Sequence, residues 1–256
     1  MKARMYWAYA TRSLVRGGQR TLLAIFCVAI GVLAIVALQL VGNAVEAGLT
    51  GNIQATNGGD IALTTSGASP LTAADLAYFG SLKAQGAITS YTAIDQQAGE
   101  LQLGTASLRS DVTAVDPSQF PLAGAPTFNS PANATLASVL QGESVVVTTP
   151  IAQALNLHVG ETAALSAQDG RSTTVTIAGI VASAGYFQGR HLLISLVAYA
   201  ALPSSSATPI TYDGVYVNVP GHTTANDNSV QTLLQAHFPL ASIQTTQALL
   251  SQNQAS

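Results

Sequence analysis

A run of 25 uncharged residues, Thr21 to Val45, lies between Arg20 and Glu46 and is rich in Leu, Ile, Val and Ala. At about 1.5 Å per residue, a helix of this length spans the roughly 30 Å hydrocarbon core of a bilayer. Its polar residues lie near the far end, where the membrane interface can hydrate them. The sequence therefore predicts a transmembrane helix over residues 21–45, and with it a membrane protein.

The basic residues are concentrated on one side of this helix. Five of the nine precede it, namely Lys2, Arg4, Arg12, Arg16 and Arg20. From Glu46 onward there are twelve acids and four bases, a net charge of −8. The positive-inside rule therefore places residues 1–20 in the cytoplasm, as a basic segment at the lipid interface, and residues 46–256 outside. The short sequence Gly17-Gly18 would supply the bend between the interfacial segment and the span.

Several function classes are excluded by what the sequence contains. An acidic outer part lacks the clustered Lys and Arg that phosphate contacts require, which argues against nucleic acid as a partner. Neither lysine, Lys2 or Lys83, lies in a glycine-rich loop, so the chain is not itself an ATPase. A single cysteine, Cys27, cannot form an internal disulfide.

No constellation for catalysis or metal binding is apparent. No two histidines are spaced as metal ligands, and the four are His158, His191, His222 and His237. Ser183 and Ser195 lack a Gly-x-Ser-x-Gly elbow, and turn formation accounts for Asp111 and Asp116. We therefore assign no catalytic, cofactor-binding or metal residue, expect no cofactor, and do not expect an enzyme.

The part beyond the predicted span alternates short strands with short helices. Residues 60–64 have the alternation of a half-buried strand. Ser69-Pro70 predicts the start of a helix that ends near Gly86, and residues 88–94 predict another strand. Residues 101–115 predict a hairpin that turns at Gly104-Thr105. The stretch Gln119 to Ser138 is rich in Pro and Gly and predicts an irregular surface loop.

The second half follows the same plan. A strand at 144–147 precedes a helix at 151–157 and a further strand, and Asp169-Gly170 predicts a tight turn into a strand at 172–181. The remaining predicted elements are a strand at 191–195, a helix at 196–202, a strand at 214–219, a helix at 226–237, a strand at 242–245 and a polar helix from Thr246. The pattern indicates an α+β extracytoplasmic domain of two subdomains, rather than a long parallel sheet.

Some stretches of the sequence also match a known family in order and spacing. They are Arg12 to Leu23, Ala29 to Val32, Gly59-Asp60-Ile-Ala-Leu, Val145 to Glu161, Thr173 to Val181 and His191 to Leu202. Taken together, they resemble the first half of the permeases of MacB/FtsX-type ABC transporters, a bacterial membrane family. The resemblance covers nearly the whole chain, and its most specific part is the strand, helix and Leu-x-Val-Gly-acid turn that ends at Glu161.

The resemblance implies a periplasmic core domain over residues 46–256 and a place in the cell membrane. It further implies a separate cytoplasmic ATPase and a second permease subunit as partners, with an outer domain that binds cargo or partner proteins. Three further membrane helices follow in that family and are not in this sequence, so we expect a truncated or split permease subunit. A face of small residues on the span would accept a partner helix and consists of Ala24, Cys27, Gly31, Ala34 and Gly42.

Two other classes stay open at this stage. A single-span surface protein, with a binding or sensing domain complete at residue 256, explains the anchor and the acidic outer part equally well. A secreted binding domain would result if Val45-Glu46-Ala47 were a signal cleavage site. The small-residue face and the order of the family-like motifs favour the permease.

Overall fold

The computed structural model describes residues 23–41, 53–65, 69–204 and 210–254, and the chain divides into two compact units, Met1–Leu49 and Thr50–Ser256. The first unit contains the helix Leu23–Val41, which is long and apolar enough to cross a membrane. Its large side chains are exposed all round, with Leu33 at 71% and Leu38 at 73%. A helix that is apolar on every face is typical of a membrane span. The predicted interfacial segment, the Gly17-Gly18 bend and Gly42 lie outside the described residues.

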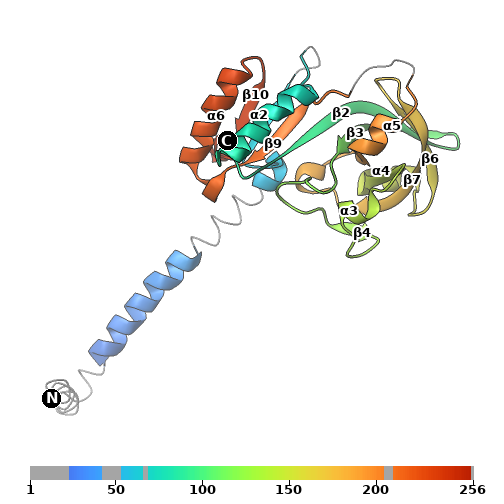
Figure 1. The fold of residues 1–256 in the computed structure, drawn as a ribbon. Helices are drawn as coiled ribbons and strands as arrows, with labels where there is room; N and C mark the ends of the chain where they lie inside the picture. Colours follow the sequence, from blue (N-terminus) through green and yellow to red (C-terminus); the bar gives the residue numbers. More distant parts are fainter. Residues whose placement is uncertain (1–22, 42–52, 66–68, 205–209, 255–256) are drawn as a thin grey trace, which may run out of the picture. The chain divides into compact units, whose positions relative to one another are not determined.

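The second unit, the outer domain, is a mixed α+β fold, as predicted (Figure 1). Its strands are β1 (Ile61–Thr64), β2 (Ser90–Leu103), β3 (Ala106–Val115), β4 (Phe128–Ser130), β5 (Ser144–Thr148), β6 (Thr162–Ala167), β7 (Ser172–Val181), β8 (His191–Ser195), β9 (Gly214–Asn218) and β10 (Ser242–Thr245). Its α-helices are α2 (Ala73–Ala84), α3 (Leu136–Val139), α4 (Thr149–Leu155), α5 (Leu196–Ala201), α6 (Thr224–His237) and α7 (Thr246–Gln254), with short 3₁₀ turns at Gly185–Phe187 and Pro220–His222.

One half of the outer domain, residues 59–94 and 210–254, is here called the sheet lobe. Its strands lie in the order β10-β1-β9-β2, and every neighbouring pair is antiparallel. Helices α2 and α6 cover one face, and the order β-α-β, β-α-β is that of a ferredoxin-like fold (Figure 1). The core between helices and sheet includes Ile61, Leu63, Phe79, Val217 and Leu234.

The other half, residues 95–204, is here called the barrel lobe. The second half of β2 pairs with both β3 and β6, and the pairings then continue through β8, β5 and β7 back to β6. The six strands therefore close on themselves, which removes exposed sheet edges. Inward-facing side chains such as Leu101, Val175 and Ile177 fill the interior, and helices α4 and α5 close it.

The two lobes share strand β2 and a third core. Ile94 and Tyr216 of the sheet lobe pack in this core with Val146 and Leu193 of the barrel lobe, and with Phe120 from the segment after β3. Strand β1 is therefore buried on both faces, because Ala62 contributes to this third core while its neighbours point into the sheet-lobe core. The sequence pattern had indicated burial on one face only.

Several predicted boundaries were wrong, for local reasons. Helix α2 begins after Thr72 and not at Ser69-Pro70, because Leu71 forms a β-bridge to Tyr212 and Thr72 forms a capping box with Asp75. The predicted strand 88–94 is the first half of the 14-residue β2. The stretch predicted as an irregular loop holds β4 and α3. Both predicted tight turns are confirmed.

Candidate functional site

The segment that enters the outer domain and the segment that leaves it are joined by hydrogen bonds. Strands β1 and β10 pair along their whole length, and α7 starts directly after β10. The amide of Thr246 donates to the carbonyl of Asp60 at 2.9 Å, and its hydroxyl donates to the carbonyl of Gly59 at 3.0 Å. Gly59 lies so close to β9 that a Cβ would be 3.0 Å from the carbonyl oxygen of Val217. A side chain at residue 59 would push the incoming segment away from the sheet.

Asp60 is the polar centre of this junction and is 4% exposed. Its carboxylate accepts hydrogen bonds from the amide of Val219 at 2.8 Å and from the Gln54 side chain at 2.7 Å, and it lies 2.8 Å from Nδ1 of His222. A second acid, Asp227 of α6, is 3% exposed. Burial raises the pKa of Asp227 to about 6, the charge of Asp60 adds to the rise, and His222 opposes it. The Asp60 contacts tie the incoming segment to the end of β9 and to the 3₁₀ turn Pro220–His222.

A second group of acids lies where the lobes meet. Asp95 of β2 is 3% exposed and accepts a hydrogen bond from the Gln97 amide at 3.0 Å. Burial raises the pKa of Asp95 to about 6, the Gln97 hydrogen bond opposes the rise, and repulsion from Asp213 and Asp169 adds to it. Asp213 accepts from the backbone amide of Gln96 at 3.0 Å. A neighbouring cavity of about 460 Å³ is lined by side chains of both lobes, including Thr64, Tyr216 and Gln168.

Asp169, next to this group, contacts the side chains of Arg171 and Tyr199. The Arg171 side chain is 5% exposed, pairs with the Asp169 carboxylate and lies over the Tyr199 ring, 5.1 Å from its centroid. The Tyr199 hydroxyl donates to Asp169 at 3.0 Å. Burial raises the pKa of Tyr199, and the charge of Asp169 raises it further, so the phenol stays protonated. This group fixes the turn between β6 and β7 against α5.

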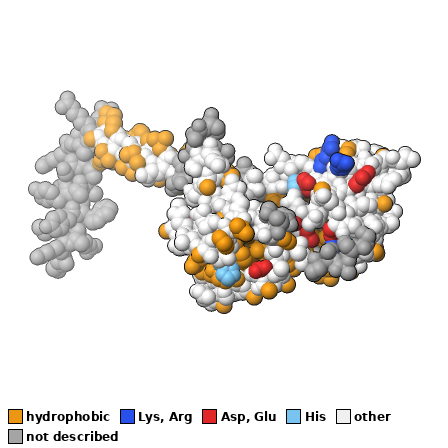
Figure 2. All heavy atoms as spheres, turned by 90° about the horizontal axis from the view of Figure 1, so that it is seen from above, with side chains coloured by type: hydrophobic (Ala, Val, Ile, Leu, Met, Phe, Trp, Pro, Cys, Tyr) orange, Lys and Arg blue, Asp and Glu red, His pale blue; other side chains and the backbone are white. Residues whose placement is uncertain are grey.

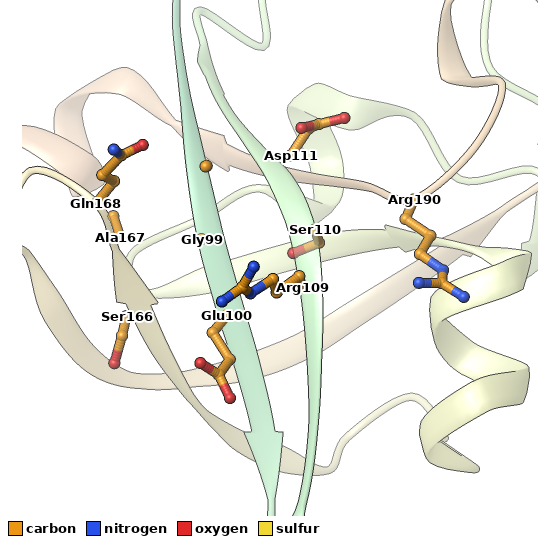
Figure 3. A pocket seen from close by; sticks show the side chains of 10 residues that line it. Gly99, Glu100, Arg109, Ser110, Asp111, Ser166, Ala167, Gln168 and Arg190 are labelled. Carbon is orange, nitrogen blue, oxygen red and sulfur yellow. The ribbon is translucent and has the colours of Figure 1, made fainter.

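An open hollow on the outside of the barrel lobe measures about 740 Å³. Strands β2, β3 and β6 and the segment before β8 line it, and four of its side chains are charged: Glu100, Arg109, Asp111 and Arg190 (Figure 3). Basic side chains are grouped on the surface of this lobe, with acidic ones beside them (Figure 2). Since charged residues are scarce in the chain, this grouping is the most distinctive surface feature of the described part.

The four histidines lie apart, in different surroundings. His158 is paired with Glu161 at 3.7 Å, His222 with Asp60, and His237 stacks on Tyr78 at 3.8 Å between ring centroids. Nε2 of His191 lies 3.1 Å from the carbonyl oxygen of Gln188. Among the described residues, no group of three or more His, Cys, Asp or Glu side chains is placed to hold a metal ion.

The serines and acids considered from the sequence have structural surroundings. The hydroxyl of Ser183 accepts from the amide of Gly189 at 2.9 Å, and Ser195 ends strand β8 and is 8% exposed. Asp116 accepts from the amide and the hydroxyl of Ser118, the turn geometry that was expected. Asp111 lies instead in the hollow of the barrel lobe.

Comparison with known proteins identifies the family. The profile of the MacB-like periplasmic core domain matches residues 21–234. The chain belongs to that family. The fold is also that of the periplasmic region of MacB from Actinobacillus actinomycetemcomitans, with a TM-score of 0.55 and 14% identity over 80% of this chain and 97% of that one. No curated protein matches the sequence. The resemblance stated from the sequence is therefore confirmed.

A second structure is similar at a lower level. The extracellular domain of the noncanonic ABC-type transporter YknZ from Gram-positive bacteria gives a TM-score of 0.49 and 11% identity, over 72% of this chain and 99% of that one. The MacB-like family points to a permease component of an ABC transporter and to no known class of enzyme. As a family member with an apolar helix before its core domain, this chain is a membrane protein with an extracytoplasmic domain.

The sequence alone did not indicate the junction at Asp60, the acids between the lobes or the charged hollow. The groups in each lie far apart in the chain, such as Asp60 with His222 and Glu100 with Arg190. The one local signal was Gly59-Asp60, a glycine that permits close backbone approach followed by a buried acid. In the sequence, this pair forms part of the family-like pattern and indicates no role by itself.

Proposed function

We propose that this chain is the anchoring and outer-domain portion of an ABC transporter permease. Residues 21–45 span the cell membrane with residues 1–20 in the cytoplasm, and residues 46–256 form the extracytoplasmic domain. That domain binds cargo or a partner protein. A separate cytoplasmic ATPase and a second permease subunit complete the machine, and the bilayer surrounds the helix.

The observation that supports coupling is the bonded junction between the incoming segment and α7. A displacement of residues 53–60 is passed to α7 through Thr246 and to β9 through Asp60. From the sheet lobe, the continuous strand β2 leads into the barrel lobe. Packed strands transmit such a displacement with little loss, because protein interiors have low compressibility.

The test is to co-express the full chain with the ABC ATPase encoded beside it and to purify the complex in nanodiscs. We expect the ATPase to co-purify and its ATP hydrolysis to depend on the outer domain. Thr246→Val, which removes the hydroxyl bond to Gly59, should reduce that dependence while the complex stays intact. Thr232→Val is the matched control, since the Thr232 hydroxyl bonds only within α6. Absence of any associated ATPase would contradict the proposal.

The topology has its own test. In a Cys27→Ala background, single cysteines at the exposed positions Ser81 and Ser204 should react with a membrane-impermeant thiol reagent on whole cells, or on spheroplasts where an outer membrane intervenes. Labelling that requires lysis would place these residues in the cytoplasm and reverse the orientation.

The small-residue face can be tested separately. No heavy atom of the described chain lies within 4 Å of where a Cβ would stand at Gly31, so Gly31→Leu does not disturb this helix itself. We expect the variant to insert normally and to co-purify less with partner membrane subunits, because the leucine keeps another helix at a distance. Co-purification equal to that of the parent chain would rule out this face as the contact.

A further inference from the structure

The hollow on the barrel lobe has an ordered polar wall. Ser166, Glu100 and Arg109 are direct neighbours across β6, β2 and β3, so their side chains stand in a row on the outer face. Arg190 lies at the opposite side, just before β8, and Gln168 lines the hollow next to β2 (Figure 3). The row and Arg190 enclose a space of about 740 Å³, within the usual range for ligand sites.

The two arginines have no counter-ion in the described structure. The ion pairs found there involve His158, Arg171 and His222, and none includes Arg109 or Arg190 within 4.0 Å. Both side chains are exposed. They are two of only four bases beyond Glu46. In a chain with so few charges, two unpaired guanidinium groups at one hollow indicate a binding role more than solvation.

The floor of the hollow is formed by small residues. Ala98 and Gly99 lie between the charged side chains, and a Cβ at Gly99 would be 2.4 Å from Cγ2 of Val112 and 3.0 Å from the carbonyl oxygen of Ser166. Close packing of the barrel interior around Val112 therefore requires glycine here. The hydroxyl of Ser110 is buried beside it without a hydrogen-bond partner. The wall of the hollow between the two arginines is therefore made of β2 and β3 with short side chains at Ala98, Gly99 and Ser110.

We propose that this hollow binds carboxylate groups, with Arg109 and Arg190 each pairing with one carboxylate of the same ligand. Guanidinium groups bind carboxylates through two parallel hydrogen bonds, and the Gln168 amide and Ser166 hydroxyl add neutral donors. Glu100 and Asp111 stand close by, so at either arginine a doubly charged phosphate group meets more repulsion than a singly charged carboxylate group. An acidic polypeptide segment and a small polycarboxylate present the same chemistry. The inference goes beyond the proposed function and does not depend on an ATPase.

The experiment uses the full chain in phosphatidylcholine nanodiscs and isothermal titration at low and at high salt. The probes are citrate and an acetylated peptide of five glutamates, with a peptide of five glutamines as the uncharged counterpart. We expect at least one acidic probe to bind and the glutamine peptide not to bind. Binding of citrate alone indicates a small ligand, and binding of the peptide alone indicates an acidic segment. Absence of binding by both overturns the proposal.

The variants separate this site from general charge attraction. Arg109→Gln and Arg190→Gln should each weaken binding about 3- to 10-fold, and Glu100→Gln should strengthen it about 2-fold, because it removes a like charge. Lys83→Gln is the matched control, as Lys83 lies on α2 outside the hollow. An equal loss for Lys83→Gln, or full affinity in both arginine variants, would refute the site. Hydrogen exchange of each variant checks that the barrel lobe is intact.

Discussion

The sheet lobe is assembled from both ends of the outer domain, whereas the barrel lobe comes from one continuous stretch of chain. In the sheet lobe, β1 and β10 are neighbours although about 180 residues separate them. In the barrel lobe, the strands close on themselves between residues 95 and 204. The first arrangement binds the segment that enters the outer domain to the segment that leads into α7. The second makes an insertion that can carry a binding surface without breaking that connection.

The two lobes also use their buried charges differently. The sheet lobe places Asp60 just before β1, where its hydrogen bonds fix the incoming segment, and buries Asp227 nearby in the first turn of α6. The barrel lobe keeps one buried pair, Arg171 with Asp169, and leaves Arg109 and Arg190 on its surface. Both lobes therefore use a buried acid in an internal tie, but the barrel lobe also presents two arginines on its surface. If this contrast is right, a substitution that destabilises one lobe should leave the stability of the other lobe largely unchanged.

The largest expected effect is in the sheet-lobe core. Phe79 is fully buried and stacks on Phe238 at 5.5 Å between ring centroids. Phe79→Ala should lower the free energy of unfolding of this lobe by about 3–5 kcal/mol, since it creates a cavity. Hydrogen exchange by mass spectrometry should show faster exchange in β1, β9 and β10. Equally faster exchange in β5 and β7 would mean that the lobes unfold as one unit.

The corresponding substitution in the barrel lobe is Gly99→Val. A valine at Gly99 would clash with Val112 and with the backbone carbonyl of Ser166, which cannot move aside like a flexible side chain. Gly99→Val should destabilise the barrel by about 3 kcal/mol, with faster exchange in β3 and β6 and little change in α6. Gly104→Ala serves as the comparison, because no heavy atom lies within 4 Å there and only the positive φ of 59° opposes the new Cβ. Wild-type exchange rates in Gly99→Val would show that the barrel opens easily at β2.

The local elements of both lobes could be predicted from the sequence, but their assembly could not. The strand–helix unit at Val145 to Leu155 and the Asp169-Gly170 turn follow from caps, turn residues and alternation over a few residues. The closure of β2 onto β6 and the pairing of β1 with β10 depend on contacts between distant segments. Strand β2 appeared as two strands because its middle residues, Asp95 to Gln97, are polar, which reflects the junction of the lobes.

Asp95 at that junction gives a prediction about pH. Its native pKa of about 6 exceeds the ordinary value of 3.8, so between these pH values the folded chain holds the proton more tightly than the unfolded chain. The free energy of unfolding should therefore fall as pH rises from 4 to 6 and stay lower above it. Asp95→Asn should remove the share of this fall that Asp95 causes, while the share of Asp227 remains, and should stabilise the chain at pH 7.5 by on the order of 2 kcal/mol.

Denaturant unfolding at pH 3.5 and at pH 7.5 measures the effect. Asp95→Asn should match the parent chain more closely at the lower pH, where Asp95 is protonated in the folded chain and mostly protonated in the unfolded chain. Glu143→Gln, at an exposed position, provides the control and should change stability little at either pH. A stabilisation of the same size at both pH values would show that packing, rather than the charge, is responsible.

The smallest expected effects concern the helix capping box, which occurs in both lobes with different acceptor groups. Each has a helix that starts with a capping box, in which the N3 side chain accepts from the backbone amide of the N-cap threonine. In α2 the acceptor is the carboxylate of Asp75, at 2.8 Å from the Thr72 amide, and in α3 it is the hydroxyl of Ser138, at 3.0 Å from the Thr135 amide. The hydrogen bond from Thr72 lowers the pKa of Asp75 below its usual range.

Asp75→Ala and Ser138→Ala should each cost about 0.5–1 kcal/mol at pH 7. Because the native pKa of Asp75 is lowered, its stabilising contribution is present above pH 3.8 and disappears as the pH falls through the native value. The cost of Asp75→Ala should therefore shrink in acid, whereas the cost of Ser138→Ala should not depend on pH. Hydrogen exchange within α2 and α3 at pH 2.5 and pH 7 compares the two. If the destabilisation by Asp75→Ala and the destabilisation by Ser138→Ala both decreased at pH 2.5, low pH would be destabilising the whole outer domain. The difference between the charged cap and the neutral cap would then be contradicted.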